Sequence, residues 1–354
     1  MNKTRVLLIF GGVSTEHEVS RCSASSIIKE IDDNQFELHI MEISKKNECY
    51  LYDLKEDKHI VIEEIKKVDN QLQKKAIEFS VDFIRRYDVV FPIIHGTEGE
   101  DGKLQGLFEV AGVPYVGANV LSSAIGMDKT FCKILFERAG IPQADYLAFT
   151  IDDDASEIVE KVESKFTYPL FIKPASQGSS VGVTKAYDRT QLEAGIELCR
   201  KVDRKILVEE FIKGRELECA VLGNYVDVEA SNIGEVLLKS DFYSYEAKYV
   251  AEEKTVITSD LDEKVVLLIK EYAIKAFKAI DCYGLARVDF FLQAGNKPVL
   301  NEINTLPGFT KISMYPKLMV DYGIPYKDLI SRLINLALER SRKYHFIVDF
   351  EEVR

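Results

Sequence analysis

The sequence lacks any long hydrophobic run and any cysteine pair with CxxC spacing. No stretch of its 354 residues approaches the roughly 18 apolar residues of a membrane-spanning helix. Its six cysteines are scattered, which favours reduced, mostly buried thiols and a cytoplasmic location. The apolar run at residues 6–10 is short and ends at Gly11 and Gly12, so it predicts a strand entering a loop rather than a signal peptide.

The chain also has fewer basic than acidic residues. The chain carries 46 Lys and Arg against 58 Asp and Glu, for a formal net charge of -12. This balance argues against nucleic acid or an anionic membrane as the main partner, and an anionic substrate would need a local cationic site or a metal. The length and the ordinary globular composition, with no low-complexity segment or internal repeat, predict two or three domains.

The N-terminal third alternates between strand and helix patterns, which predicts a doubly wound α/β domain. We expect strands at residues 6–10, 37–42 and 88–94 and helices at 20–31 and up to 110, with surface loop and helix over the highly charged segment 53–80. Ligands of such sheets bind beyond the carboxyl ends of the strands. The loops at 11–20 and 95–102 both follow strand ends and could therefore face one crevice.

The rest of the chain predicts two further units. We expect strands at 168–173, 206–210 and 217–222, and helices at 128–138, 262–280 and 326–342. The expected domains are residues 1–121, 122–215 and 216–354.

Two strand-like runs near the C-terminal end carry the most chemistry. Gly295-Asn296 between them is a two-residue hairpin signal. With that dipeptide as the turn, Asp289 lies opposite Glu302 and Arg287 lies opposite Asn304. Because side chains two apart on a strand share a face, all four should project from one side of the hairpin.

Two carboxylates and an amide oxygen on one face form a site for a hard cation such as Mg²⁺ beside phosphates. A solvated polar face is the commoner explanation for alternating charge. Opposed carboxylates would, however, repel each other without a cation, so the pattern favours a metal.

Other segments suggest a nucleotide, each with a plain alternative. The glycine-rich segment 177–182 follows a strand bearing Lys173, and its backbone N–H groups could approach phosphate, although it is not a Walker A loop and a simple turn fits as well. Lys129 could be a second phosphate cation or a solvated lysine. Glu209 and Glu216 could hold ribose hydroxyls or be surface charges.

Three further segments leave alternatives open. The aromatic stretch ending at Lys248 and Tyr249 is either a packed strand or a mobile loop over a substrate. Glu16 could bind an ammonium group, although helix capping is the commoner role, and His17 is expected to be structural. Amides and a hydroxyl in the segment 304–313 could bind a carboxylate or an oxyanion.

Taken together, these segments resemble D-alanine–D-alanine ligases of the ATP-grasp superfamily. The resemblance rests on motifs that occur in order from residue 6 to about 316: FGGVSTEHEVS at 10–20, HGTEGEDG at 95–102, MDK at 127–129, KPASQGSSVG at 173–182, YEAKY at 245–249, ARVDF at 286–290 and NEINTLPG at 301–308. Each motif alone is modest, but their order and spacing are specific.

The resemblance implies a three-domain fold, with an N-terminal α/β domain and two domains that clasp ATP between antiparallel sheets. It implies ATP-dependent joining of two D-alanine molecules, through a D-alanyl phosphate, for peptidoglycan precursors. It also implies ATP and two Mg²⁺ or Mn²⁺ ions as cofactors, and a homodimer formed through the N-terminal domain.

Residue roles follow from the same resemblance. Asp289, Glu302 and Asn304 match metal ligands, Lys129 and Lys173 match phosphate-binding lysines, and Glu209 and Glu216 match residues near adenine and ribose. Glu16 matches the acid that binds the first D-Ala ammonium group, His95 lies near its carboxylate, and Arg287 with the Gly308 amide matches the oxyanion hole. Ser179 and Tyr249 match a hydrogen-bonded set with Glu16, Lys248 and Ser313 match groups that orient the second D-Ala, and Met314 lies beside that substrate.

The sequence departs from the family pattern at a few positions. Gln177 stands where many relatives have Glu, Met314 stands where Leu is common, and residues 255–262 lack a proline-containing stretch. A ligase using D-Ser or D-Lac as second substrate is the nearest rival, but relatives of that kind differ near Met314 or carry His in place of Tyr249. A nucleotide-binding regulatory protein without catalysis is disfavoured, because the polar groups that the reaction needs are present.

Overall fold

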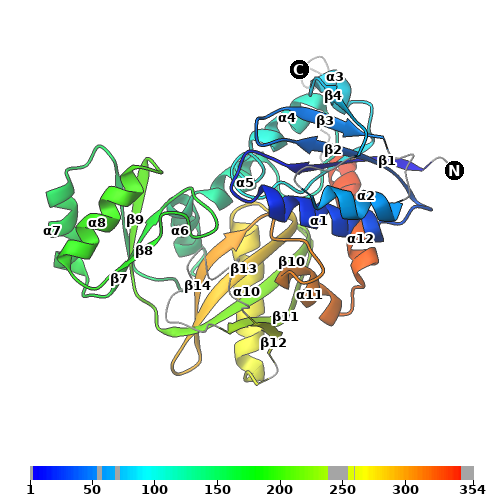
Figure 1. The fold of residues 1–354 in the computed structure, drawn as a ribbon. Helices are drawn as coiled ribbons and strands as arrows, with labels where there is room; N and C mark the ends of the chain where they lie inside the picture. Colours follow the sequence, from blue (N-terminus) through cyan, green and yellow to red (C-terminus); the bar gives the residue numbers. More distant parts are fainter. Residues whose placement is uncertain (1–2, 54–57, 68–71, 238–253, 259, 344–354) are drawn as a thin grey trace, which may run out of the picture.

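The computed structural model describes residues 3–53, 58–67, 72–237, 254–258 and 260–343. Its strands form three sheets, with the orders β4-β3-β2-β1-β5, β6-β9-β7-β8 and β12-β11-β10-β13-β14. Each sheet is packed with helices, so the predicted mixed α/β class is confirmed (Figure 1). Our domain boundaries, at 121/122 and 215/216, stay a prediction.

The N-terminal sheet has a buried parallel centre. Strands β1 (Thr4–Gly11), β2 (Phe36–Ile43) and β5 (Val89–Pro92) pair in parallel, and six consecutive residues of β1 are buried. Helices α1 (His17–Glu30), α3 (Val81–Ile84) and α4 (Lys103–Ala111) belong to the same unit. The expected strands and helices of this region are therefore present.

The expectation for residues 53–80 was only partly right. Helix α2 (Lys58–Ile65) is present, but the segment also holds β4 (Lys74–Ile77), which pairs antiparallel with β3 (Cys49–Tyr52) at the sheet edge. Three of the four β4 residues are exposed. An exposed edge strand needs no apolar alternation, so its sequence resembles a polar loop.

The loops after β1 and β5 lie together, as predicted. The Ser14 hydroxyl donates to the His95 carbonyl oxygen over 2.7 Å, and the Ser20 hydroxyl donates to the Ile93 carbonyl oxygen over 2.5 Å. These bonds hold the start of α1 against the end of β5.

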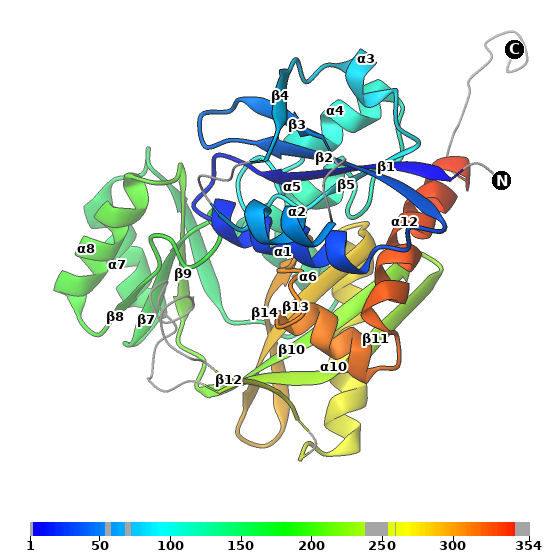
Figure 2. The same cartoon turned by 45° about the vertical axis from the view of Figure 1, so that its right-hand side comes forward.

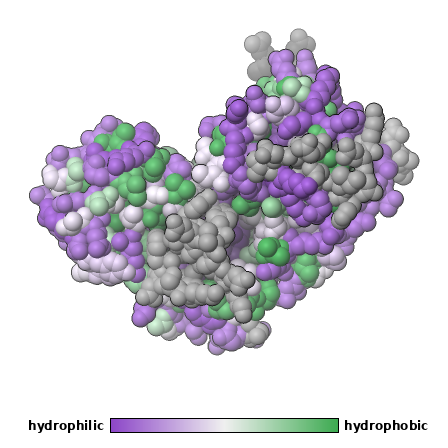
Figure 3. All heavy atoms as spheres, in the orientation of Figure 1, coloured by the Kyte–Doolittle hydropathy of each residue, from purple (hydrophilic) through white to green (hydrophobic). Residues whose placement is uncertain are grey.

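The second unit is a small antiparallel sheet covered by two helices. Its strands are β6 (Tyr146–Thr150), β7 (Leu170–Pro174), β8 (Thr184–Ala186) and β9 (Lys205–Glu210), and its helices are α7 (Ala155–Lys165) and α8 (Arg189–Arg200). Helices α5 (Val120–Met127) and α6 (Lys129–Arg138) connect it to the N-terminal unit. In Figure 3 this unit is a separate lobe, with a notch between it and the N-terminal lobe.

The third sheet combines β10 (Gly214–Asn224), β11 (Asp227–Leu237), β12 (Lys254–Ile257), β13 (Tyr283–Gln293) and β14 (Lys297–Asn304). Helix α10 (Glu263–Ala279) packs on one face, against Leu217, Cys219 and Val221 of β10. Helices α11 (Met314–Asp321) and α12 (Tyr326–Lys343) pack on the other face, against Ala220 and Leu222 (Figure 2). This second face continues along β10 to Glu218 and Glu216.

The hairpin of β13 and β14 has the predicted pairs but not the predicted turn. Arg287 lies opposite Asn304, and Asp289 lies opposite Glu302. The loop, however, joins Gln293 to Lys297 and so contains three residues rather than two. An extra residue in β14, Asn301, shifts the register back between the loop and Glu302.

Four of the six cysteines are buried, as expected. They are Cys132, Cys199, Cys219 and Cys282, and burial raises the pKa of each thiol to about 12. Within the described ranges, no helix is long and apolar enough to cross a membrane.

Candidate active site

The polar face of the β13–β14 hairpin is held together by the Asp289 carboxylate. Arg287 donates to it twice, from Nε over 2.7 Å and from Nη2 over 2.6 Å, and the Asn304 side-chain amide donates over 3.0 Å. The predicted gathering of these side chains on one face is therefore present. Arg287 also supplies positive charge that offsets the opposed carboxylates.

A further carboxylate on β10 was missed from the sequence. Glu218 lies opposite Asp289 across the β10–β13 pair, and its Oε1 is 3.2 Å from Arg287 Nε. Burial lowers the pKa of Arg287, but Asp289 and Glu218 outweigh burial and hold that pKa well above its usual value. The hairpin pattern could not reveal Glu218, because the order of strands in the sheet is not readable from the hairpin alone.

The donor set of this face suits a hard cation. Asp289 and Glu302 contribute carboxylate oxygens, and Asn304 directs its NH₂ group to Asp289, which leaves its amide oxygen for a cation. Over the described residues, no cluster of three or more His, Cys, Asp and Glu side chains is placed to hold a metal. The assignment of a metal to Asp289, Glu302 and Asn304 stays a prediction.

Two predicted phosphate lysines converge on this face from different elements. Lys129 begins α6, and its Nζ donates to the Gln177 carbonyl oxygen over 2.9 Å and lies 3.7 Å from Glu302 Oε2. Lys173 on β7 lies 2.5 Å from Glu209 and donates to Asn301 over 3.3 Å. The glycine-rich loop, the lysines and the hairpin therefore meet at one place.

Sequence reasoning missed a third lysine, Lys133. Its side chain is almost fully buried, and its Nζ lies 2.5 Å from Glu209 Oε1. The four-residue spacing from Lys129 on α6 was a usable signal, because it places both lysines on one side of the helix. Glu209, predicted near adenine, thus lies between two ammonium groups.

The loop residue Ser179 reaches across to the N-terminal unit. Its hydroxyl donates to Glu16 Oε1 over 2.6 Å, and both Ser179 and Ser180 have left-handed backbones, with φ of 50° and 58°. Glu16 precedes α1, but its side chain makes no capping hydrogen bond, so the capping interpretation was wrong. Gly96 has a φ of 76°, which favours glycine, and a Cβ there would lie 2.8 Å from Glu16 Oε2.

His95 is buried beside Glu16 and is held on both ring nitrogens. Nδ1 lies 3.0 Å from the Leu306 carbonyl oxygen and Nε2 lies 3.0 Å from Ser23 Oγ. Burial lowers the pKa of His95, but Glu100, 3.8 Å away, outweighs burial and raises it. Glu100 was not predicted. His17 is buried with Nδ1 2.6 Å from the Gly12 carbonyl oxygen, in keeping with a structural role.

The segment after β14 turns back on itself. Ser313 Oγ accepts from the Thr310 backbone N–H over 3.1 Å, and a Cβ at Gly308 would lie 3.1 Å from the same oxygen. Met314 is buried, and its sulfur packs against Gly234 of β11.

Glu216 lies on β10 opposite Phe291 and adds to the negative charge around Lys173. Lys248 and Tyr249 lie outside the described residues.

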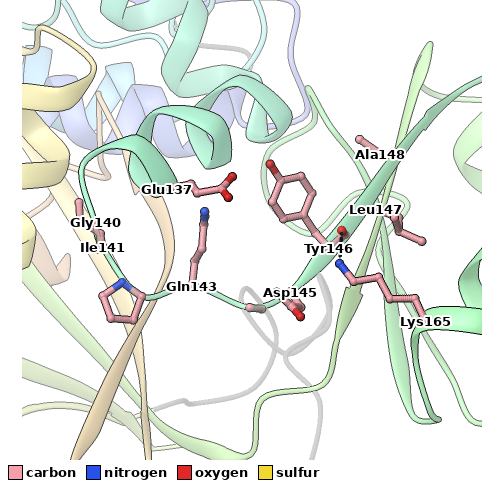
Figure 4. Close-up of a pocket in the computed structure, with 11 residues that line it drawn as sticks. Glu137, Gly140, Ile141, Gln143, Asp145, Tyr146, Leu147, Ala148 and Lys165 are labelled. Atoms are coloured by element: carbon pink, nitrogen blue, oxygen red, sulfur yellow. Dashed lines mark hydrogen bonds between the residues drawn. The ribbon is translucent and has the colours of Figure 1, made fainter.

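A separate cavity of about 600 Å³ lies along the connection between α6 and β6. Figure 4 shows Glu137, Gln143 and Tyr146 around it, with the Lys165 ammonium bonded to the Tyr146 carbonyl oxygen over 3.1 Å. None of the predicted site residues lines it. The predicted residues therefore do not place the candidate site in this cavity.

Comparison with known proteins identifies the family. The family described as D-ala D-ala ligase N-terminus matches residues 5–118, and D-ala D-ala ligase C-terminus matches residues 135–335. A D-alanine--D-alanine ligase from Acetivibrio thermocellus is 49% identical, over 96% of this chain and 97% of its own.

Solved structures agree as well. The VanG D-Ala:D-Ser ligase of Enterococcus faecalis matches with a TM-score of 0.85 and 36% identity, over 95% of this chain and all of its own. The D-alanine--D-alanine ligase of Bacillus anthracis, complexed with ATP, matches with a TM-score of 0.75 and 27% identity, over 96% and 99% of the two chains. The resemblance found in the sequence is confirmed, and the chain belongs to the D-alanine–D-alanine ligase family.

Proposed function

We propose that this protein joins two D-alanine molecules into D-alanyl-D-alanine, with conversion of ATP to ADP and phosphate, for peptidoglycan precursors. The observation that carries the proposal is the position of the glycine-rich loop. Its Gln177 carbonyl oxygen binds Lys129 beside Glu302, and its Ser179 binds Glu16 in the N-terminal unit. One loop therefore links the nucleotide side of the site to the substrate side.

The phosphate end of ATP is assigned to the converging lysines and the hairpin. Lys129 and Lys173 form a local positive site for the phosphates, although the net charge of the chain is negative. Asp289, Glu302 and Asn304 would hold two Mg²⁺ or Mn²⁺ ions. These ions, when bound, neutralise the charge that develops on the transferring phosphate.

The first D-alanine is assigned to the Glu16 side. The Glu16 carboxylate binds its ammonium group, and His95 lies near its carboxylate. An oxygen of that carboxylate attacks the γ-phosphorus as the bond to the ADP oxygen breaks, giving D-alanyl phosphate and ADP. Holding both groups in line is the main contribution of the protein to this step.

The second D-alanine completes the reaction. Its free amine attacks the acyl carbon, and Arg287 with the Gly308 amide stabilises the oxygen of the tetrahedral intermediate before phosphate leaves. Ser313 and Lys248 orient its carboxylate, and Met314 borders its methyl group. Acyl phosphates react with water, so the Ser179–Glu16 contact, with Tyr249, closes the site during this step.

A ligase that uses D-serine as its second substrate is the alternative that one observation favours, the 36% identity to the VanG D-Ala:D-Ser ligase. The apolar, buried Met314 favours D-alanine, because a serine hydroxyl would be left without a partner there. The identity of the second substrate is tested by incubation with ATP, Mg²⁺ and D-Ala, alone or with D-Ser or D-Lac. We expect phosphate and D-alanyl-D-alanine from D-Ala alone; phosphate release only when D-Ser or D-Lac is present would refute the proposal.

The remaining expectations concern assembly and location. We propose a cytoplasmic homodimer that forms through the N-terminal unit, as the family resemblance implies. Light scattering after size-exclusion chromatography would test the dimer, and a monomer at micromolar concentration would contradict it.

A further inference from the structure

Lys133 is a buried cation to which the proposed reaction gives no role. It is 3% exposed on α6, with its Nζ 3.3 Å from the Ala144 carbonyl oxygen and 5.0 Å from the centre of the Tyr146 ring. A buried ammonium group is costly unless it is paired. Its ion partner is the Glu209 carboxylate, 2.5 Å away.

Glu209 divides its two oxygens between two lysines. Oε1 faces Lys133 and Oε2 faces Lys173, each at 2.5 Å. Burial raises the pKa of Glu209, but the two ammonium groups outweigh burial and hold this pKa at about 2. The carboxylate is therefore ionised and is shared equally in distance by the two cations.

The charges of this trio determine what Lys173 can offer to a ligand. Two ammonium groups and one carboxylate carry a net charge of +1. Without Lys133, the remaining Lys173–Glu209 pair is neutral. In a buried site with a low local dielectric constant, this difference in charge strongly changes the electrostatic attraction of a nearby phosphate.

Besides Glu209, the Lys173 ammonium group contacts the hairpin. Its ammonium group donates to Asn301 over 3.3 Å, and Asn301 immediately precedes Glu302. The surplus charge is therefore presented where the phosphates and their cations are proposed to lie, whereas Lys133 lies on the opposite oxygen of Glu209.

We propose that Lys133 is a positioning residue for nucleotide phosphates. It acts through Glu209, by neutralising this carboxylate so that the Lys173 ammonium group remains available to phosphate. The inference rests on the proposed ATP site. Its alternative is a structural role only, in which Lys133 secures the connection at Ala144 and Tyr146.

The two roles differ in their dependence on phosphate. Binding of ATP, ADP and adenosine to Lys133→Met would be measured by calorimetry, with Lys161→Met as control. Lys161 is an exposed lysine on α7 that pairs with Glu157 over 3.3 Å. We expect affinity for ATP and ADP to fall at least tenfold in Lys133→Met, and affinity for adenosine to change less than twofold.

Other results of this measurement would overturn the inference. Equal losses for all three ligands would indicate a structural role, because adenosine carries no phosphate. Unchanged ATP affinity would show that the trio does not need Lys133. Lys133→Arg keeps the charge and should retain most ATP affinity; a loss as large as that of Lys133→Met would also count against the inference.

A rescue experiment tests the route through Glu209. In Lys133→Met/Glu209→Gln, the carboxylate charge that competes for Lys173 is removed, so ATP should bind more tightly than to Lys133→Met alone. No rescue would overturn the inference. If Lys133→Met does not fold, as judged by thermal unfolding, the double variant is compared with Glu209→Gln, and the two should bind ATP within about twofold, because Lys133 then has no carboxylate to neutralise.

Failure of the inference and failure of the proposed function are separable. Wild-type protein that binds ATP but forms no D-alanyl-D-alanine refutes the function and leaves the binding measurements valid. Wild-type protein that forms the dipeptide, with Lys133→Met unaffected in ATP binding, refutes the inference alone.

Discussion

The Ser179 hydroxyl donates a hydrogen bond of 2.6 Å to the Glu16 carboxylate, across 163 positions of sequence. Ser179 belongs to the glycine-rich loop after β7, and Glu16 lies at the start of α1. The contact therefore links the loop assigned to the phosphates with the residue assigned to the first D-alanine. A single hydrogen bond can in this way couple nucleotide binding to closure over the amino acid.

Removing this hydrogen bond should uncouple phosphate release from dipeptide formation. In Ser179→Ala the loop loses a hydrogen bond to a charged group, worth about 1.5–3 kcal/mol, so dipeptide formation should fall roughly ten- to a hundredfold. Water then reaches the D-alanyl phosphate, and phosphate released should exceed dipeptide formed. Both products would be measured in one assay, with the exposed α7 variant Ser164→Ala as control. A ratio that stays at one would contradict a closing role for Ser179.

The metal assignment predicts a different outcome at the hairpin. Asp289→Asn keeps the size of the side chain but removes the charge that would bind Mg²⁺, so phosphate release with D-Ala should fall at least a hundredfold. Binding of Mn²⁺ in the presence of ADP, followed by electron paramagnetic resonance, should weaken in parallel. Asp227→Asn, at the exposed first position of β11, is the matched control. Near-normal phosphate release would refute the assignment.

The hairpin shows how far local sequence can determine a site. Alternation and a turn signal were enough to pair Asp289 with Glu302, because side-chain direction along a strand has a period of two. The predicted turn was one residue too short, and the extra residue Asn301 in β14 restores the predicted pairing beyond it. The bulge was not readable from the sequence, although it places Asn301 against Lys173.

Features that depend on contacts between distant elements were not predictable in this way. Glu218 joins the hairpin through the order of the strands, and Glu100 joins His95 through the folding of its loop. Lys133 was overlooked because a lysine on a helix is usually solvated, whereas this one is buried against Glu209. The family resemblance supplied roles for residues whose own patterns left alternatives open.

The buried trio also predicts how stability depends on pH. The folded-state pKa of Glu209 is about 2, below its ordinary value of 4.5, so its contribution is fully present above pH 4.5 and is lost as the pH falls toward 2. Glu209→Gln leaves two buried lysines without their carboxylate and should lower the free energy of unfolding at pH 7 by about 3–5 kcal/mol. In urea unfolding, the gap between wild type and variant should narrow below pH 4.5.

The control for this measurement is Glu193→Gln, which removes an exposed carboxylate paired with Arg189 on α8. Its effect should stay below about 1 kcal/mol at every pH. A Glu209→Gln gap that is constant from pH 7 to pH 3 would show that the carboxylate is not stabilised by its two lysines.

The contact between Gly117 and Gly284 gives a final prediction about how the N-terminal and third units are held together. A Cβ at Gly284 would lie 3.0 Å from the Gly117 Cα, and Gly284 has a φ of 75°. Gly140 has a similar φ of 69°, but no atom lies within 4 Å of its added Cβ. Gly140→Ala should therefore cost only the backbone strain, about 1–2 kcal/mol, whereas Gly284→Ala should cost about 1–3 kcal/mol more. Urea unfolding of the two variants measures the difference, and equal losses would mean that the two backbones are not in close contact in solution.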